Sequence, residues 1–186
     1  MDLFLIKHKL QHDFPLVRET TLPHPQRAAV MVLLYPKPKK THVLMTRRAM
    51  HLKYHAGEVS FPGGVFEEQD DDLLATALRE TEEELAIQVQ PEDVLGQLPV
   101  VNTRLGFEIT PFVSVLPSAP EYEPAENEVG EVLEIPFTSL LLTQQRDVGS
   151  KPSEEVKRFC LHSNRIWCVP AKILKPISHL SRELRE

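Results

Sequence analysis

Residues 60–84 join a glycine turn to a helix that carries more carboxylates than folding alone would select. In a helix over about residues 73–85, the 100° step per residue puts Glu80, Glu83 and Glu84 on one stripe beside an apolar stripe. Like charges at these spacings cost roughly 0.2–0.5 kcal/mol each, and the helix dipole disfavours anions near the C-terminal end. A hard divalent cation would offset this cost, because Mg²⁺ and Mn²⁺ bind clustered carboxylate oxygens. The pattern therefore indicates a metal site.

Two neighbouring features favour the metal site over the competing interpretation, in which the glutamates are only a solvated helix face. Arg79 lies four residues before Glu83 and can hold its carboxylate. Gly63 and Gly64 lie just upstream, and their missing Cβ atoms let this backbone approach a ligand closely. A purely structural acidic helix would instead predict that metal ions leave the thermal stability unchanged.

The segments around this stretch predict alternating strands and helices. An apolar run at residues 28–35 is typical of a strand buried on both faces. Pro111 indicates an edge strand or an irregular strand start, and Pro176 should kink or end the closing helix. Together these elements predict an α/β fold, with a mixed sheet between helical layers. Further strands are expected at residues 42–46, 94–100, 110–116 and 132–135.

Length and composition indicate one domain over residues 1–186, with an N-terminal arm at about residues 1–27. The net charge of −6 argues against nucleic-acid binding. No apolar run approaches the length of a membrane span, so we expect a cytoplasmic protein that does not enter a membrane. Cys160 and Cys168 have no zinc-site spacing and are expected to be buried thiols. A two-residue hairpin turn between them would pair Cys160 with Trp167.

The acidic helix and its loop resemble the signature of the Nudix hydrolases, which we place at about residues 64–87. That signature is Gly, five residues, Glu, seven residues, Arg-Glu, an aliphatic residue, any residue, Glu-Glu, any residue, Gly and an aliphatic residue. Here the loop carries one extra residue, because counting forward from Gly64 reaches Asp70 while counting back from Arg79 reaches Asp71. The resemblance implies the Nudix α/β/α sandwich with a mixed β-sheet. Further departures are Thr81 for the aliphatic residue and Ala86 for the glycine.

Residues 43–64, VLMTRRAMHLKYHAGEVSFPGG, resemble the motif of the coenzyme A pyrophosphatase branch of this family. The motif runs Leu-Leu-Thr-x-Arg, a short spacer, Leu-Arg-x-His-x-Gly and Phe-Pro-Gly-Gly. Met45 and Lys53 are mild departures, and further along the chain Cys168 and Pro170 stand where glycine and threonine are usual. The matching positions are Leu44, Thr46, Arg48, Leu52, His55, Gly57 and residues 61–64.

Cations within and beside this motif could bind the phosphates of such a substrate. A diphosphate needs positive charge, arginine can bind phosphate bidentately, and coenzyme A carries a further 3′-phosphate. Arg47 and Arg48 could equally be surface charges at a strand end, and His55 could equally be a hydrogen-bonding residue that fixes the loop. The expected substrate-binding residues are Arg47, Arg48, Lys53, His55 and Gly63.

The resemblance implies a mechanism in which Mg²⁺ or Mn²⁺ neutralises the diphosphate and activates a water molecule. Glu80 and Glu84 would bind the metal, with help from Glu83 and the Gly64 carbonyl. Arg79 would act as a catalytic residue by orienting Glu83.

The proton acceptor stays open between Glu83 and a carboxylate downstream of the helix. Glu128 resembles the downstream position from which the family takes a further metal ligand or base. Glu126 and Glu131 compete with it for that role.

We therefore expect a hydrolase for a small-molecule substrate, coenzyme A or its derivatives, with 3′-phospho-ADP and 4′-(acyl)phosphopantetheine as products. The alternatives are a Nudix pyrophosphatase for ADP-ribose or a dinucleotide, and a non-catalytic Nudix-fold binding module. Such a module would normally have lost the helix carboxylates, and this chain keeps them. Whether the protein is a homodimer, and which metal it prefers, stays open.

Overall fold

The computed structural model describes residues 3–18, 24–38, 40–146, 157–161, 164–166 and 168–183. The helices are α1 (Leu3–Asp13), α2 (Leu73–Leu85), α3 (Phe137–Leu142) and α4 (Cys168–Glu183), with a 3₁₀ turn at Pro91–Asp93. The strands are β1 (Arg27–Lys37), β2 (Lys40–Arg48), β3 (Val59–Ser60), β4 (Gly63–Val65), β5 (Val94–Gln97), β6 (Val101–Asn102), β7 (Glu108–Val115), β8 (Val129–Pro136), β9 (Gln144–Arg146), β10 (Lys157–Leu161) and β11 (Asn164–Ile166).

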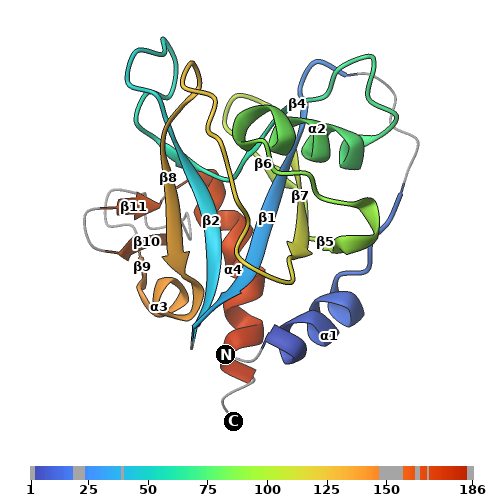
Figure 1. The fold of residues 1–186 in the computed structure, drawn as a ribbon, viewed down its shortest axis with the longest axis vertical. Coiled ribbons are helices and arrows are strands. Elements are labelled where there is room, and N and C mark those ends of the chain that lie inside the picture. Colours follow the sequence, from blue (N-terminus) through green and yellow to red (C-terminus); the bar gives the residue numbers. More distant parts are fainter. Residues whose placement is uncertain are drawn as a thin grey trace.

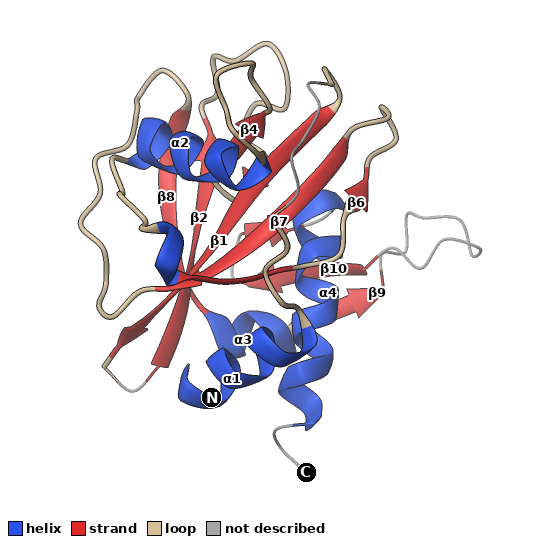
Figure 2. Ribbon diagram, turned by 90° about the vertical axis from the view of Figure 1, so that its right-hand side faces the viewer, coloured by secondary structure: helices blue, strands red, loops and turns tan. Residues whose placement is uncertain are grey.

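Within these ranges, eight strands form a mixed sheet, and β9, β10 and β11 form a small second sheet (Figure 1). The central path of the large sheet is β3-β2-β1-β7-β5, while β4, β6 and β8 pair with β1, β7 and β2. β1 runs antiparallel to β2 and parallel to β7. Figure 2 shows α2 on one face of this sheet and α4 on the other. The expected mixed sheet between helical layers is therefore confirmed.

β1 explains why a hydrophobic core forms on each face, because successive side chains of a strand point to opposite faces. Met31 and Leu33 pack in the core beneath α2, whereas Val32 and Leu34 pack in the core that α4 shares. All four are fully buried, and burying such a side chain contributes roughly 1.5–3 kcal/mol. The apolar run of the sequence is thus a strand buried on both faces, as predicted.

α2 has the bounds that the sequence predicts, and specific contacts close both of its ends. The Asp72 side chain caps the first turn by accepting the Ala75 N–H at 2.8 Å. At the other end Ala86 adopts a left-handed conformation with φ 56°, which ends the helix. Leu74 and Leu85 are buried in the core beneath α2 and fix the rotation of the helix about its axis. The acidic stripe next to them is thereby aimed at β4.

β7 contradicts the edge-strand prediction made from Pro111. It lies inside the sheet, between β1 on one side and β5 and β6 on the other. The strand expected at residues 94–100 ends at Gln97, and β6 begins only at Val101, so a break lies opposite Pro111. The Leu98 N–H still donates to the Pro111 carbonyl, at 2.8 Å. A residue without an N–H fits there because the strand pairing is already interrupted.

Pro176 does not end the closing helix, which continues to Glu183, so an early end at this residue is wrong and the kink stays a prediction. A proline inside a helix costs about 3 kcal/mol through a lost hydrogen bond and a clash with the preceding turn. Leu174 and Ile177 lie on either side of it in α4 and are almost fully buried. Their burial offsets the cost of the proline.

The hairpin before α4 has a different register from the one that the cysteine spacing suggested. Phe159 pairs with Ile166, so Cys160 does not lie opposite Trp167. Phe159 and Ile166 are both fully buried, and a slip of one residue would turn them to the other face. Cys168 starts α4, while the two cysteine side chains and Trp167 lie outside the described residues.

The N-terminal arm packs against the sheet through α1. Ile6 and Leu10 are buried in the core that α4 shares, and Pro15 bridges to Gly96 in β5. No helix in the described ranges is long and apolar enough to span a membrane.

Candidate metal and diphosphate site

Glu84 is the most buried carboxylate of the acidic stripe, with 6% of its surface exposed. The Gly63 N–H donates to its carboxylate, but Oε2 is buried without a hydrogen-bond partner among the described residues. Burial, together with the negative charges of Glu80 and Glu128, raises the pKa of Glu84 to about 8. A buried carboxylate that lacks a partner is a group that a cation would satisfy.

Glu80 lies directly against the glycine pair of β4. A Cβ atom on Gly64 would overlap the Glu80 carboxylate, so only glycine leaves room for this side chain. Burial raises the pKa of Glu80, although Arg79 next to it acts in the opposite direction. The negative charges of Glu83 and Glu128 add to the rise.

Arg79 binds the carboxylates on both sides of it. Its guanidinium makes a two-point contact with Asp70, from Nε to Oδ1 at 2.9 Å and from Nη2 to Oδ2 at 3.1 Å. Nη1 donates to Glu80 Oε1 at 3.0 Å and to Glu83 Oε2 at 2.9 Å. The contact with Glu83 that the spacing suggested is therefore present. It holds Glu83 on the outside of the stripe, where its side chain is 59% exposed.

Asp70 resolves the path of the loop that carries one extra residue. Besides binding Arg79, it accepts the Thr76 hydroxyl at 2.8 Å and the Glu67 N–H at 3.0 Å. Although burial raises the pKa of Asp70, the hydrogen bonds from Arg79 and from Glu67 lower it below its ordinary value. Asp71 is exposed. The sequence showed both aspartates, and the count forward from the glycine identifies the one that binds the arginine.

Glu128 is the downstream carboxylate whose charge acts on the helix stripe, because it raises the pKa of both Glu80 and Glu84. Glu131, which competed with it, accepts a hydrogen bond from Arg47 Nε at 2.9 Å. Glu126 is exposed, and the leading causes of the raised pKa values of Glu80 and Glu84 include Glu128. The structure thus brings Glu128 to the stripe, whereas Glu131 belongs to an ion pair with β2.

Among the basic residues of the motif at residues 43–64, Arg48 is one whose charge acts on a carboxylate of the stripe. Its charge lowers the pKa of Glu84, and its Nε is buried without a hydrogen-bond partner among the described residues. A bulge in the β2–β8 pairing occurs at the Arg47–Arg48 step, and bulges redirect side chains near binding sites. Arg47 itself binds the Gly57 carbonyl at 3.1 Å.

The loop after β2 holds two further residues, Lys53 and His55, that the sequence suggested for phosphate binding. His55 has a left-handed backbone with φ 57°, and its Nδ1 lies 3.0 Å from Glu58 Oε2. This contact fits the loop-fixing interpretation of His55. Lys53 is exposed, with its Nζ 5.2 Å from the centre of the Tyr54 ring. These two side chains therefore stand further out than Arg48.

The donor set fits a hard cation, but the carboxylates are not gathered in advance. No three His, Cys, Asp or Glu side chains in the described part of the chain are grouped as a ready metal site. Glu80 and Glu83 are both engaged by Arg79. The fit rests on the unpartnered Glu84 oxygen and on the mutual repulsion of Glu80, Glu84 and Glu128, which a cation would relieve.

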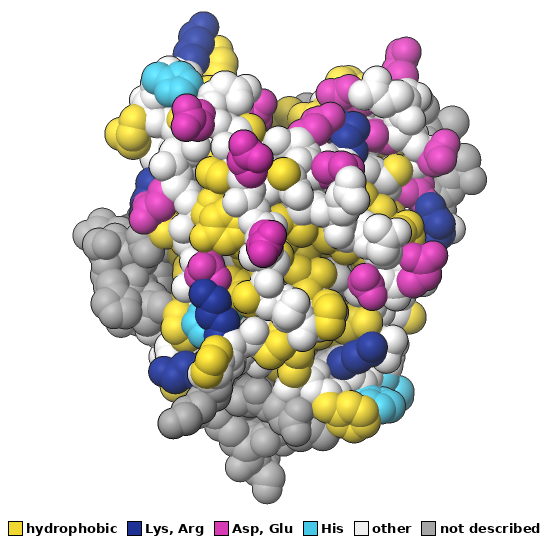
Figure 3. Space-filling model, viewed as in Figure 1, with side chains coloured by type: hydrophobic (Ala, Val, Ile, Leu, Met, Phe, Trp, Pro, Cys, Tyr) yellow, Lys and Arg dark blue, Asp and Glu magenta, His cyan; other side chains and the backbone are white. Residues whose placement is uncertain are grey.

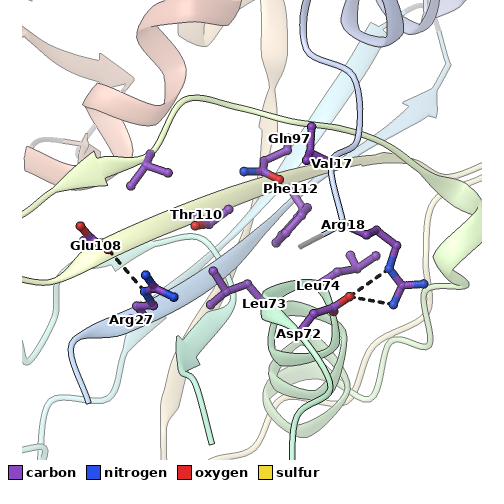
Figure 4. A pocket seen from close by; sticks show the side chains of 11 residues that line it. Val17, Arg18, Arg27, Asp72, Leu73, Leu74, Gln97, Glu108, Thr110 and Phe112 are labelled. Atoms are coloured by element: carbon purple, nitrogen blue, oxygen red, sulfur yellow. Dashed lines mark hydrogen bonds and ion pairs between the residues drawn. The ribbon is translucent and has the colours of Figure 1, made fainter. Parts of the chain in front are cut away.

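A cavity of about 160 Å³ lies beside the N-terminal end of α2, at the opposite end of the helix from the acidic stripe (Figure 4). Its charged side chains are already paired, Arg18 with Asp72 at 2.8 Å and Arg27 with Glu108 at 3.5 Å. None of the site residues that the sequence suggested lines this cavity. It therefore carries no part of the chemistry considered for the acidic stripe.

The Asp70–Arg79 contact predicts that Asp70→Asn lowers the free energy of unfolding by about 3 kcal/mol, because it leaves a largely buried guanidinium without its strongest partner. The control is Asp71→Asn, which removes the same charge from an exposed neighbour and should change stability by less than about 0.5 kcal/mol. Urea denaturation of both variants measures the difference. Equal losses of stability in Asp70→Asn and Asp71→Asn would contradict the assignment of Asp70 as the partner of Arg79.

The raised pKa of Glu84 predicts that, in the absence of divalent cations, the free energy of unfolding depends on pH. Between the ordinary value of 4.5 and about 8, the folded protein keeps a proton that the unfolded chain has released. The free energy of unfolding of the wild type therefore falls as the pH rises through this window. Glu84→Gln cannot ionise, so it should match the wild type near pH 5 and exceed it by about 2 kcal/mol or more at pH 8.

Thermal and urea unfolding at several pH values in EDTA test this expectation. Glu82→Gln is the matched control, because Glu82 is exposed on the same helix. Addition of Mn²⁺ should raise the melting temperature of the wild type and of Glu82→Gln but leave Glu84→Gln unchanged. Parallel pH profiles for all three proteins would contradict the assignment.

Comparison with known proteins identifies the family. The family model of the NUDIX domain matches residues 25–162. An uncharacterized Nudix hydrolase, NudL, of Escherichia coli O139:H28 is 39% identical over 141 residues, which cover 76% of this chain and 71% of that relative. NudL of Escherichia fergusonii has the same identity and coverage.

Solved structures agree in fold. A MutT/nudix family protein from Enterococcus faecalis superposes with a TM-score of 0.61 at 17% identity, covering 100% of this chain and 71% of that one. The NUDIX domain of Shewanella oneidensis NrtR, solved in complex with ADP ribose, has a TM-score of 0.58 at 20% identity, covering 88% and 90%. At such identities the likeness concerns the fold alone. With the domain match and the 39% identity to NudL, it follows that the chain belongs to the Nudix hydrolase family.

Proposed function

We propose that the chain is a Mg²⁺- or Mn²⁺-dependent hydrolase that cleaves the diphosphate of coenzyme A or its derivatives, giving 3′-phospho-ADP and a 4′-phosphopantetheine product. Hydrolases of the Nudix family generally use divalent metal cations. The observation that carries the proposal is the buried, unpartnered Glu84 oxygen beside Glu80, with the Arg48 guanidinium close by. This arrangement joins a cation site to a phosphate-binding cation.

Each residue of the stripe would have a separate role in binding the cation or in aligning its ligands. Glu80 and Glu84 would hold the cation, with the Gly64 carbonyl and Glu83 as further ligands. When bound, the cation neutralises a diphosphate and makes water a better nucleophile. Arg79 keeps Glu80 and Glu83 aligned through its two hydrogen bonds from Nη1.

Glu128 would accept the proton of the attacking water. It is exposed to solvent, and its negative charge raises the pKa of both Glu80 and Glu84. Glu83 is the other candidate, but its carboxylate is already engaged by Arg79. A proton acceptor has to lie within hydrogen-bond reach of the water, which favours a carboxylate that can still turn toward it.

The choice of coenzyme A rests on the motif at residues 43–64 and on the positive charge that it brings to an acidic protein. Figure 3 shows acidic side chains gathered around α2 and the neighbouring loops, with few basic ones among them. Arg48 would bind the diphosphate, while Lys53 and His55 stand further out and could meet a more distant phosphate. ADP-ribose, the ligand of the Shewanella domain, shares the ADP half without a 3′-phosphate and is therefore the natural competitor.

Hydrolysis of coenzyme A in Mg²⁺ or Mn²⁺, with products separated by chromatography, tests the proposal. Wild type should release 3′-phospho-ADP and phosphopantetheine. Glu84→Gln should lose at least about 100-fold in kcat, because losing a metal ligand removes several kcal/mol of transition-state stabilisation. Glu82→Gln removes the same charge from the outer side of the helix and should keep most of the activity.

Two further substrates separate the outcomes. 3′-Dephospho-coenzyme A should be cleaved with a higher KM, because it lacks the phosphate that the basic loop would bind. Cleavage of ADP-ribose or a dinucleotide without cleavage of coenzyme A would overturn the substrate and leave the metal site standing. No cleavage of any diphosphate by the wild type would favour the binding module.

A further inference from the structure

Residues 117–128, which we call the strap, connect the end of β7 to the start of β8. Figure 1 shows the strap crossing in front of β1, on the face of the sheet that carries α2. The N–H groups of Glu123 and Ala125 donate to the carbonyls of Leu85 and Glu84, both at 2.9 Å. The strap thereby satisfies carbonyls that the end of a helix leaves without partners in the helix itself.

Glu128 stands at the end of the strap, and its main chain is tied on two sides. Its N–H donates to the Ala125 carbonyl at 2.9 Å, and its own carbonyl accepts the Ala49 N–H at 2.8 Å. Ala125 is the residue that binds the main chain of Glu84. The position of Glu128 relative to Glu84 therefore depends on where the strap lies.

A second attachment fixes the strap to β8 through the side chain of Glu134. The Tyr122 hydroxyl donates to Glu134 Oε1 at 3.3 Å. The hydroxyl of Tyr35, a fully buried residue of β1, donates to Oε2 of the same carboxylate at 2.7 Å, and Lys37 forms an ion pair with it. Glu134 is thus held from the sheet through one oxygen and binds the strap through the other. Although burial raises the pKa of Glu134, the bonds from Lys37 and Tyr35 lower it, which keeps the carboxylate charged.

We propose that Glu134 and Tyr122 are positioning residues, which hold the strap so that Glu128 stays next to the Glu80–Glu84 pair during hydrolysis. The two attachments lie on different elements, the end of α2 and β8, so together they restrict both sliding and rotation of the strap. Misplacing a reacting group by 1 Å can cost about 100-fold in rate. The inference rests on the proposed function, because it acts through the role assigned to Glu128.

The variant that tests the anchor most directly is Tyr122→Phe, which removes one hydroxyl from an exposed ring and leaves the Tyr35–Glu134 bond in place. We expect kcat on coenzyme A to fall about tenfold, with KM and the melting temperature close to those of the wild type. Glu134→Gln should have a larger effect on kcat, because it also weakens the ion pair with Lys37. Glu121→Gln, a charge change at an exposed position of the strap, is the matched control and should leave kcat unchanged.

A double-mutant cycle separates positioning from mere stabilisation. If Tyr122 acts through Glu128, its substitution should change kcat little in a Glu128→Gln background, since the group being positioned is already lost. Equal effects of Tyr122→Phe in both backgrounds would overturn the proposal. So would a Tyr122→Phe protein whose kcat equals that of the wild type.

Amide hydrogen exchange provides a readout that does not depend on any substrate. In Tyr122→Phe the amides of Glu123 and Ala125 should exchange several-fold faster, while those in the middle of α2 keep their protection. A wild type that hydrolyses nothing would overturn the proposed function, and the anchor would then be judged on exchange alone. Unchanged exchange at these two amides would overturn it, whereas faster exchange in Tyr122→Phe and not in Glu121→Gln would support it.

Discussion

Repulsion among three carboxylates, of which Glu84 is buried, Glu80 partly buried and Glu128 exposed, is the constraint on which the rest of the site depends. Glu84 is buried, Glu80 is pressed against a glycine, and Glu128 adds its charge from the neighbouring strap. Charges of one sign are not brought together in this way unless protons or cations compensate them. The protein supplies only part of that compensation, through Arg48 and Arg79. We propose that a divalent cation supplies the remainder.

The surroundings of the stripe keep this repulsion from being relieved by simple movement. Asp70 occupies two nitrogens of Arg79, so the guanidinium is fixed in direction and does not neutralise the stripe completely. The backbone of β4 is paired to β1 and blocks an outward shift of Glu80. On the other side the strap is bonded to the end of α2 and to Glu134. The acidic stripe is thus enclosed by three attachments that come from distant parts of the chain.

Features with a local signal could be predicted from the sequence, whereas features that depend on distant pairing could not. The bounds of α2 and the contact of Arg79 with Glu83 follow from helical spacing alone. Two proline predictions failed at least in part, because both prolines depend on elements from elsewhere in the chain. A break in the strand pairing lies opposite Pro111, and Leu174 and Ile177 beside Pro176 are buried in a core that distant strands share.

The same limit applies to the polar contacts around the site. Glu134 and Tyr35 lie 99 residues apart, and nothing in either segment announces their hydrogen bond. The choice between Asp70 and Asp71 depended on the route of a loop, which spacing left ambiguous by one residue. The charges of Glu126, Glu128 and Glu131 look alike in the sequence, and it is the pairing of β8 with β2 that places Glu131 opposite Arg47.

α2 carries its apolar stripe and its acidic stripe side by side on one helix, so the two stripes rotate together and cannot evolve independently. With side chains about 5 Å from the helix axis, a 20° rotation of the helix moves a carboxylate by about 2 Å. Substitutions at Leu74 or Leu85 that repack the core would rotate the helix and change the spacing of the oxygens. In the metal-dependent hydrolase that we propose, drift of these core residues would therefore be restricted by catalysis as well as by folding, and metal preference could change through positions that never touch the metal.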